Sequence, residues 1–251
     1  MATVAVPRKS DIRILPGRRY DNIFFSVMAG IILVLVGVGF ARTYFLAGVF
    51  RAHLPALIIH IHGAAFTAWI LLLITQTSFV SAKRIDLHRK LGLWGFGLAC
   101  LMVVLGFLAA TNGLSRNMAP PGFPFGAQTF YAIPLADMFV FATLIFFAYR
   151  ARTNPTAHKR LIILATAAIM DAPTGRPPFA VITGRPHFDS IFVWALILLL
   201  VGYDLWSTRK VHRATIWGGL FVVIVEILRV PIGMSGTWHA FASWILTLPH
   251  F

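Results

Sequence analysis

Long apolar stretches, separated by short polar turns, place the strongest limit on what this chain can fold into. The clearest stretch runs from Leu54 to Val80, contains no Lys, Arg, Asp or Glu, and is followed by the basic turn Lys83–Lys90. About 20 apolar residues suffice for a helix to cross the hydrocarbon core of a bilayer. The stretch therefore predicts a membrane-spanning helix, with lipid as its surroundings.

Six further stretches repeat this pattern, and the charged fraction of 12% is about half that of a soluble domain. We expect an all-α integral membrane protein, a seven-span helical bundle over residues 22–232. A basic leader, residues 1–21, precedes it. An aromatic, apolar tail, residues 233–251, lies at the outer interface or begins an eighth span. The predicted spans are 22–41, 54–80, 89–111, 129–149, 158–172, 188–206 and 213–230.

The basic residues alternate between the two sides of this predicted bundle. Sixteen of the 22 Lys and Arg residues lie in the leader and in the turns after the second, fourth and sixth spans. Because Lys and Arg are retained on the cytoplasmic side, we expect a cytoplasmic N-terminus and a periplasmic C-terminus in a bacterial inner membrane. The placement of the +14 net charge in short turns excludes nucleic acid as the partner.

A histidine-containing motif recurs at the cytoplasmic ends of three predicted spans. LHRK at 87–90, AHKR at 157–160 and VHRA at 211–214 each open an odd-numbered span. The motif indicates either a duplicated helical hairpin or ordinary interfacial residues at helix ends. A basic turn requires only charge, so we favour the helix-end interpretation.

Ionisable groups are costly inside a bilayer, and five predicted spans bring polar groups to one layer in the outer half of the bundle. Counting a rise of about 1.5 Å per residue from each helix end places them at similar depth. We expect them to share a pocket. The candidate pocket residues are His60, His62, Asn112, Asp137, Asp171, Glu226 and Arg229.

Each member of this pocket also has a simpler structural interpretation. Glu226 and Arg229 are three residues apart, so they can pair on one helix face. Asp137 or Asp171 can cap a broken helix or pair with a nearby arginine, either Arg176 or Arg185. Both aspartates should be shielded from lipid and close to another polar group, because a lone carboxylate facing lipid is too costly.

His60 and His62 are two residues apart and point to different helix faces, about 200° apart, so they cannot both bind one ion. His62, Trp69 and Gln76 repeat every seven residues and form one stripe. We expect this stripe to face the bundle centre, with His62 nearest the carboxylates and His60 turned toward a neighbouring span. His62 is therefore the candidate metal or cofactor ligand.

The tetrapeptide TGRP occurs twice after the fifth predicted span, at 174–177 and 183–186. Prolines end a helix at or near the residue that precedes them, which predicts a non-helical segment here. Arg176, Arg185 and His187 are candidates for binding an anion or a lipid headgroup, since guanidinium groups bind carboxylate and phosphate through paired hydrogen bonds.

The motifs HIHGAAFTAWILLLITQTS and LHRKLG resemble a group of bacterial multi-pass proteins known only as predicted membrane proteins. This resemblance covers mainly residues 57–110 and implies no activity. The chain also resembles, more weakly, cytochrome b561-type proteins, in which histidines on neighbouring spans hold haem b. It departs from that pattern, because its membrane histidines lie on the second span and at span ends.

These residues leave three classes of function open. The first is a redox or cofactor-binding protein in which His60 or His62 contacts haem b, a metal ion or a quinone. The second is a transporter of a small anionic or protonatable solute, and the third is an accessory or assembly subunit of a larger membrane complex or a homo-oligomer. The last span lacks the lysine of a retinal protein, and no Walker, HExxH or GxSxG motif occurs.

Overall fold

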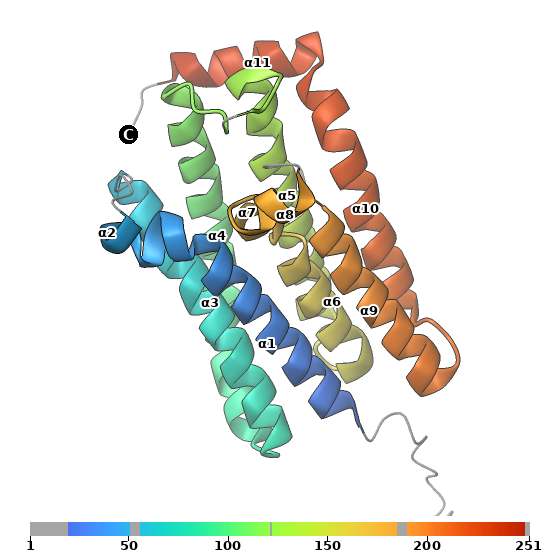
Figure 1. Cartoon of the computed structure of the whole chain (residues 1–251). Helices are drawn as coiled ribbons and strands as arrows, with labels where there is room; N and C mark the ends of the chain where they lie inside the picture. Colours follow the sequence, from blue (N-terminus) through green and yellow to red (C-terminus); the bar gives the residue numbers. More distant parts are fainter. Residues whose placement is uncertain (1–19, 51–55, 121, 185–189, 249–251) are drawn as a thin grey trace, which may run out of the picture.

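The computed structural model describes residues 20–50, 56–120, 122–184 and 190–248, which form a helical bundle without a strand (Figure 1). Six of the described helices are long and apolar enough to cross a membrane, which supports a multi-pass membrane protein. They are α1 (Asp21–Phe40, continued by the π-helical turn Ala41–Phe45), α3 (Leu57–Ser81), α4 (Ile85–Ser115), α5 (Gly126–Arg150), α9 (Ile191–Thr208) and α10 (Arg213–Gly233). The expected leader lies outside the described residues except for its last two positions.

The fifth predicted span, residues 158–172, is the one that differs from expectation. Its place is taken by α6 (Pro155–Ala167), a three-residue turn and the short helix α7 (Asp171–Thr174). The side chain of Asn154 caps α6 by accepting from the backbone N–H of Ala157, and Pro155 fits its first turn. Seven of the 13 residues of α6 are buried, so this helix is surrounded by protein.

The core of the bundle lies around α5 and α6. α5 packs against α4, α6 and α10, and α6 also packs against α1, α9 and α10. Trp69 of α3 donates a hydrogen bond from Nε1 to Thr166 Oγ1 of α6, at 3.1 Å, and its ring packs on Phe141 of α5. This buried contact divides the interior of the bundle into two halves, each with its own polar groups.

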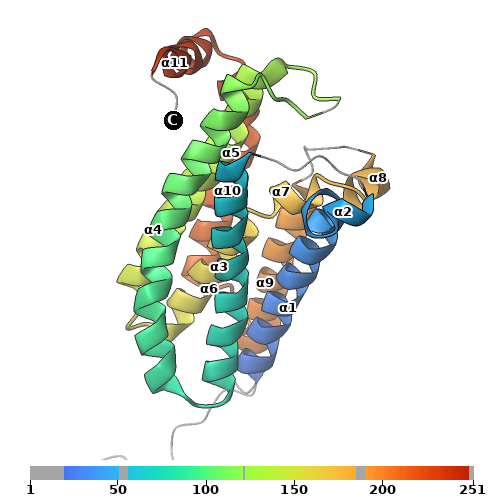
Figure 2. The same ribbon diagram turned by 90° about the vertical axis from the view of Figure 1, so that its left-hand side faces the viewer.

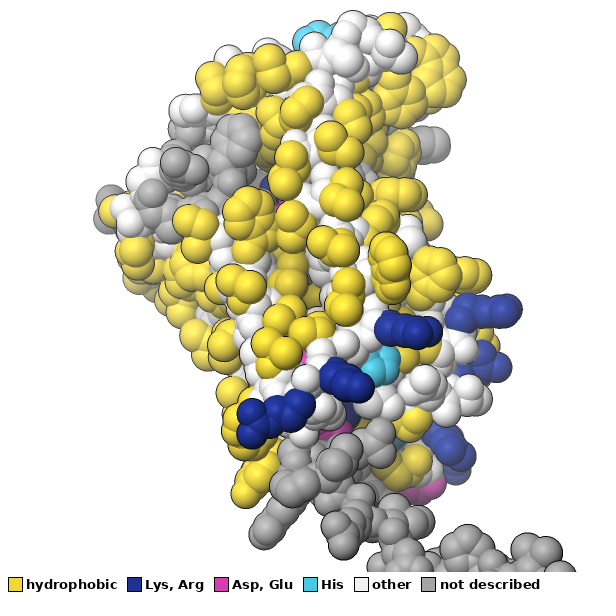
Figure 3. All heavy atoms as spheres, turned by 90° about the vertical axis from the view of Figure 1, so that its right-hand side faces the viewer, with side chains coloured by type: hydrophobic (Ala, Val, Ile, Leu, Met, Phe, Trp, Pro, Cys, Tyr) yellow, Lys and Arg dark blue, Asp and Glu magenta, His cyan; other side chains and the backbone are white. Residues whose placement is uncertain are grey.

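The surface of the bundle is apolar along most of its length. Figure 3 shows hydrophobic side chains covering the face drawn, with Lys and Arg gathered at its lower end. Leu198 of α9 and Trp217 of α10 are among the most exposed, at 67% and 71%. Such a surface suits contact with lipid tails. We call the end with the basic turns the inner end, and the opposite end the outer end.

The C-terminal tail forms a short helix at the outer end of the bundle. α11 (Gly236–Thr247) has 12 residues and lies across the outer ends of α4, α5 and α10 (Figures 1 and 2). His239 Nε2 lies 3.1 Å from Thr129 Oγ1, and Trp238 Nε1 donates to the carbonyl of Gln128 at 2.8 Å. These bonds hold α11 against the N-terminal turns of α5.

A buried ion pair fixes α6 at the inner end. Arg160 and Asp204 of α9 pair with side chains 2% and 0% exposed, and Arg160 Nε donates to Asp204 Oδ1 at 3.0 Å. Asp204 also accepts from Thr215 Oγ1 at 2.6 Å and from the backbone N–H of His212 at 3.0 Å. Burial lowers the pKa of His212, and its Nδ1 accepts from the Ala214 N–H as the cap of α10. Three helices are joined here, with every group paired.

Candidate functional sites

Arg229, in the outer half of α10, is the centre of a buried polar cluster. Its Nη1 donates to Asp137 Oδ1 of α5 at 2.7 Å, and its Nη2 donates to Asp171 Oδ2 of α7 and to Ser190 Oγ. The side chains of Asp137 and Asp171 are 13% and 5% exposed. The prediction that both aspartates are shielded and close to a polar partner is confirmed. Below, the outer cluster means Asp137, Asp171, Glu226 and Arg229.

The partners inside the outer cluster differ from those expected. Glu226 does not pair with Arg229 on its own helix; its Oε2 accepts from Trp194 Nε1 of α9 at 2.5 Å. The guanidinium of Arg229 is occupied by carboxylates from two other elements, so Glu226 forms its hydrogen bond with α9 instead. Two carboxyl oxygens, Asp171 Oδ1 and Glu226 Oε1, are buried and have no hydrogen-bond partner among the described residues.

A cavity of ≈ 240 Å³, the outer cavity, adjoins the outer cluster and is bounded by α1, α3, α4, α5 and the segment after α6. His62 and Asp137 both line it. The ring of His62 stacks on Phe66, and its Nδ1 is buried without a partner. His60 turns instead toward the first helix, where its Nδ1 lies 3.0 Å from the hydroxyl of Tyr44. Both orientations match the expectation.

The other predicted site residues are not brought into this cluster. Asn112 lines neither of the described cavities and bonds to no cluster member through its side chain. Arg176 lines the outer cavity but pairs with neither aspartate; its guanidinium stacks on Phe40 and donates to the Ala172 carbonyl. Of the alternatives for the two aspartates, the pairing with Arg176 is therefore not observed, and Arg229 is their partner among the described residues. Arg185 and His187 lie outside the described residues.

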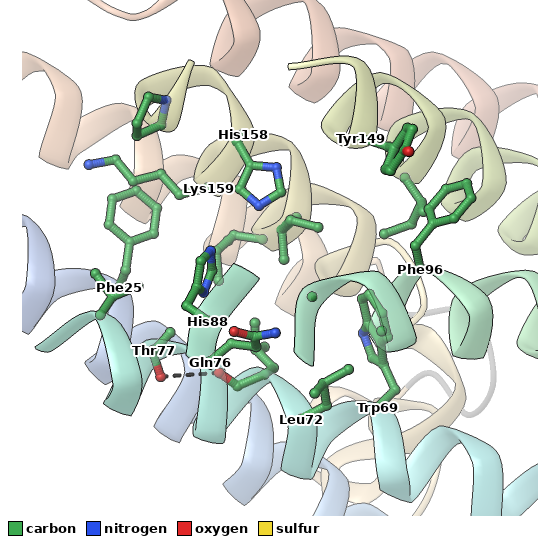
Figure 4. Close-up of a pocket in the computed structure, with 18 of the residues that line it drawn as sticks. Phe25, Trp69, Leu72, Gln76, Thr77, His88, Phe96, Tyr149, His158 and Lys159 are labelled. Carbon is green, nitrogen blue, oxygen red and sulfur yellow. Dashed lines mark hydrogen bonds between the residues drawn. The ribbon is translucent and has the colours of Figure 1, made fainter. Parts of the chain in front are cut away.

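A larger cavity of ≈ 430 Å³, the inner cavity, lies in the other half of the bundle, between α1, α3, α4, α5 and α6 (Figure 4). His88 reaches it from the first turn of α4, and His158 from the first turn of α6. Figure 4 shows the two rings turned toward each other. Their centres are 6.3 Å apart, and their planes are inclined by 85°.

Hydrogen bonding leaves a nitrogen of this histidine pair available to a ligand. The Nδ1 of His158 lies 2.8 Å from the carbonyl oxygen of Ala148. Because a carbonyl can only accept, Nδ1 carries the hydrogen, and the lone pair of the neutral ring is on Nε2. The Nδ1 of His88 is buried and has no hydrogen-bond partner in the part of the chain that the structure describes. The sequence analysis assigned both residues to helix ends, although the repeated LHRK and AHKR motifs marked them.

The wall of the inner cavity is largely apolar on the side of α4. Gly92 and Gly95 line it without side chains, and Phe96 stacks on Tyr149 with ring centres 4.4 Å apart. Gln76 and Lys159 add polar groups, and Lys159 pairs with Asp21 at the inner end. The cavity is therefore suited to a largely apolar molecule whose polar end lies toward the inner end.

The described residues contain no group of three or more His, Cys, Asp or Glu that could hold a bare metal ion. No family model, curated protein or solved structure matches this chain. The arguments for function below therefore start from the two cavities and the outer cluster.

Proposed function

We propose that this protein is a membrane redox protein that binds haem b in the inner cavity through His88 and His158. The observation that carries the proposal is the pair of facing imidazoles. With metal–nitrogen bonds of about 2 Å, two imidazoles on opposite sides of one ion have ring centres about 6 Å apart. The centres of these two rings are 6.3 Å apart.

The residues around the pair favour haem over the other cofactors considered. A bare zinc ion takes about four ligands, whereas the inner cavity offers two histidines. An iron held in a porphyrin needs only axial ligands from the protein. The hydrogen bond from His158 Nδ1 to a carbonyl is the support that metal-binding histidines commonly have. A quinone would use one imidazole and leave the facing arrangement unexplained.

The chain's own residues define what the site does. His88 and His158 would hold the iron, and bound haem supplies one-electron transfer. The aromatic residues beside the site exclude water, and the basic turns at the inner end favour the anionic edge of a porphyrin. The assignment moves the ligand role from His62 to His88 and His158.

The test is an absorbance spectrum of the protein purified in mild detergent from haem-replete bacterial cells. We expect a reduced-minus-oxidised spectrum of a six-coordinate b-type haem, at about one haem per chain. His88→Ala and His158→Ala should each remove this spectrum, because each leaves the iron without one axial ligand.

His60→Ala is the matched control, since it removes another membrane histidine that bonds only to Tyr44. It should keep the spectrum. Purified wild-type protein without haem, or alanine variants that keep the six-coordinate spectrum, would contradict the proposal. Co-extraction of a quinone in place of haem would return the inner cavity to the quinone interpretation.

We also propose seven crossings of a bacterial inner membrane with the N-terminus in the cytoplasm, where α6 and α7 together form the fifth crossing. The sixteen-to-six division of Lys and Arg supports this orientation. Reporter fusions after Lys83, Arg152 and Lys210 should therefore all report the cytoplasm, and one after Arg116 the periplasm. A periplasmic signal from any of the first three would disprove the topology.

A further inference from the structure

The outer cluster carries more negative than positive charge. It holds three carboxyl groups, from Asp137, Asp171 and Glu226, and the single guanidinium of Arg229. The relative exposures of Asp171, Glu226 and Arg229 are 7%, 8% and 3%. Three carboxylates and one guanidinium leave two negative charges unbalanced in a place with little water. Such an excess is strongly unfavourable unless a cation or a proton joins it.

The surrounding elements do not balance this excess among the described residues. α3 contributes His62, and the segment after α7 contributes Arg176. Trp194 of α9 and Ser190, the residue before α9, are neutral. Even with Arg176 counted, one negative charge remains. The inner ion pair differs in this respect, because Asp204 has one cation and a full set of donors.

The positions of the two unpaired carboxyl oxygens indicate where a proton would bind in the outer cluster. Within the described part of the chain, Asp171 Oδ1 and Glu226 Oε1 are both buried and accept no hydrogen bond, although Asp171 Oδ2 and Glu226 Oε2 each have donors. A carboxylate oxygen without a donor is costly when buried, whereas a protonated carboxyl group can itself donate. Asp171 Oδ1 and Glu226 Oε1 are therefore the two atoms at which a bound proton would relieve the cost of burial.

Asp137 gives the cluster access to the outer cavity. One of its carboxyl oxygens accepts from Arg229, and its side chain also lines the outer cavity together with His62. His62 has a buried Nδ1 without a partner in that cavity. Among the members of the outer cluster, Asp137 is the one whose residue lines the outer cavity.

We propose that the outer cluster is a proton-binding site, which holds at least one exchangeable proton on the Asp171–Glu226 carboxyl groups and loads it through Asp137 from the outer cavity. Proton uptake converts one carboxylate into a carboxylic acid and needs no other reactant. The site is separate from the proposed haem site, because its residues lie in the other half of the bundle.

Infrared spectroscopy of the purified protein at neutral pH tests this proposal. We expect a carbonyl stretching band of a protonated carboxyl group that shifts in heavy water. Glu226→Gln and Asp171→Asn should each remove or at least halve the band. Asp137→Asn should keep the band but slow its shift after transfer to heavy water by tenfold or more. Asp86→Asn, an exposed carboxyl at the inner end, is the matched control and should change neither the band nor its shift.

Two further measurements, on His158→Ala and on the wild-type protein in buffer without sodium and potassium ions, make each outcome decisive. His158→Ala should keep the band, so that loss of haem and loss of the proton site are distinguished. A wild-type protein without the band in sodium-free and potassium-free buffer would disprove the proposal. A band that appears only when these ions are removed would show that a monovalent cation occupies the site instead, and this also overturns it. Size-exclusion elution at the wild-type volume shows that each variant is folded.

Discussion

Replacing Arg160 by leucine is expected to lower the free energy of unfolding by about 3–5 kcal/mol, because Asp204 would stay buried without its cation. Asp204 is 0% exposed and is placed by donors from the α9–α10 turn and from α10. An uncompensated carboxylate would therefore have no route to water. The loss is measured by denaturant or thermal unfolding of the detergent-solubilised protein.

The double variant Arg160→Leu/Asp204→Asn tests the reason for this loss. Asparagine keeps an acceptor for Thr215 Oγ1 and removes the charge, so most of the lost stability should return. Arg152→Leu, an exposed base nearby, should change stability by less than about 0.5 kcal/mol. Equal losses in the single and double variants would show that charge is not the cause.

Replacing Arg229 by methionine is expected to have an equal or larger effect, about 3–5 kcal/mol or more, since one cation serves two carboxylates. We expect the variant to accumulate poorly and to aggregate after extraction. The yield of monodisperse protein and its apparent melting temperature, measured beside wild type, report this. An apparent melting temperature of Arg229→Met equal to that of wild type would refute the ion pairs described for the outer cluster.

A rescue experiment separates charge from packing at this position. Asp137→Asn and Asp171→Asn, added together to Arg229→Met, remove both carboxylates that would lack a cation. The triple variant should recover a large part of the yield. The same two substitutions in a chain that keeps Arg229 should be destabilising, because they leave the guanidinium buried without an anion.

The sequence predicted the long helices well because lipid imposes a simple requirement on them. A helix that faces lipid needs about 20 apolar residues, and α1, α3, α4, α5, α9 and α10 all meet it. α6 is different, because its neighbours are other helices. It carries Arg160 and Thr166 into the interior, where Asp204 and Trp69 bind them, so its sequence is less apolar and its continuous helix shorter.

The membership of the outer cluster could also be predicted, but not its pairing. Ionisable residues within a span have to face the interior, which brings Asp137, Asp171 and Glu226 to one region. Which carboxylate Arg229 contacts depends on how the other helices are rotated about their axes and on where the helix is interrupted between α6 and α7. The local rule for residues three apart favoured Glu226, whereas the fork of Arg229 reaches across to α5 and α7.

That His88 and His158 face each other could not be predicted from the sequence, for a related reason. Each lies in the first turn of its helix, where a histidine is unremarkable. Only the packing of α4 and α6 along the two sides of α5 brings the rings to face each other. The recurring motif at 87–90 and 157–160 held the signal, and its interpretation required the fold.

The position of Arg229 on the last long helix has a consequence for biogenesis. A chain is made from its N-terminus, so α5 and α7, with Asp137 and Asp171, leave the ribosome before α10 does. Until α10 joins them, both carboxylates lack their guanidinium. A nascent chain or a truncation that ends before residue 229 therefore retains charges that the bilayer penalises. Synthesis of α10 completes the assembly, and incomplete chains carry a marker that membrane quality control can detect.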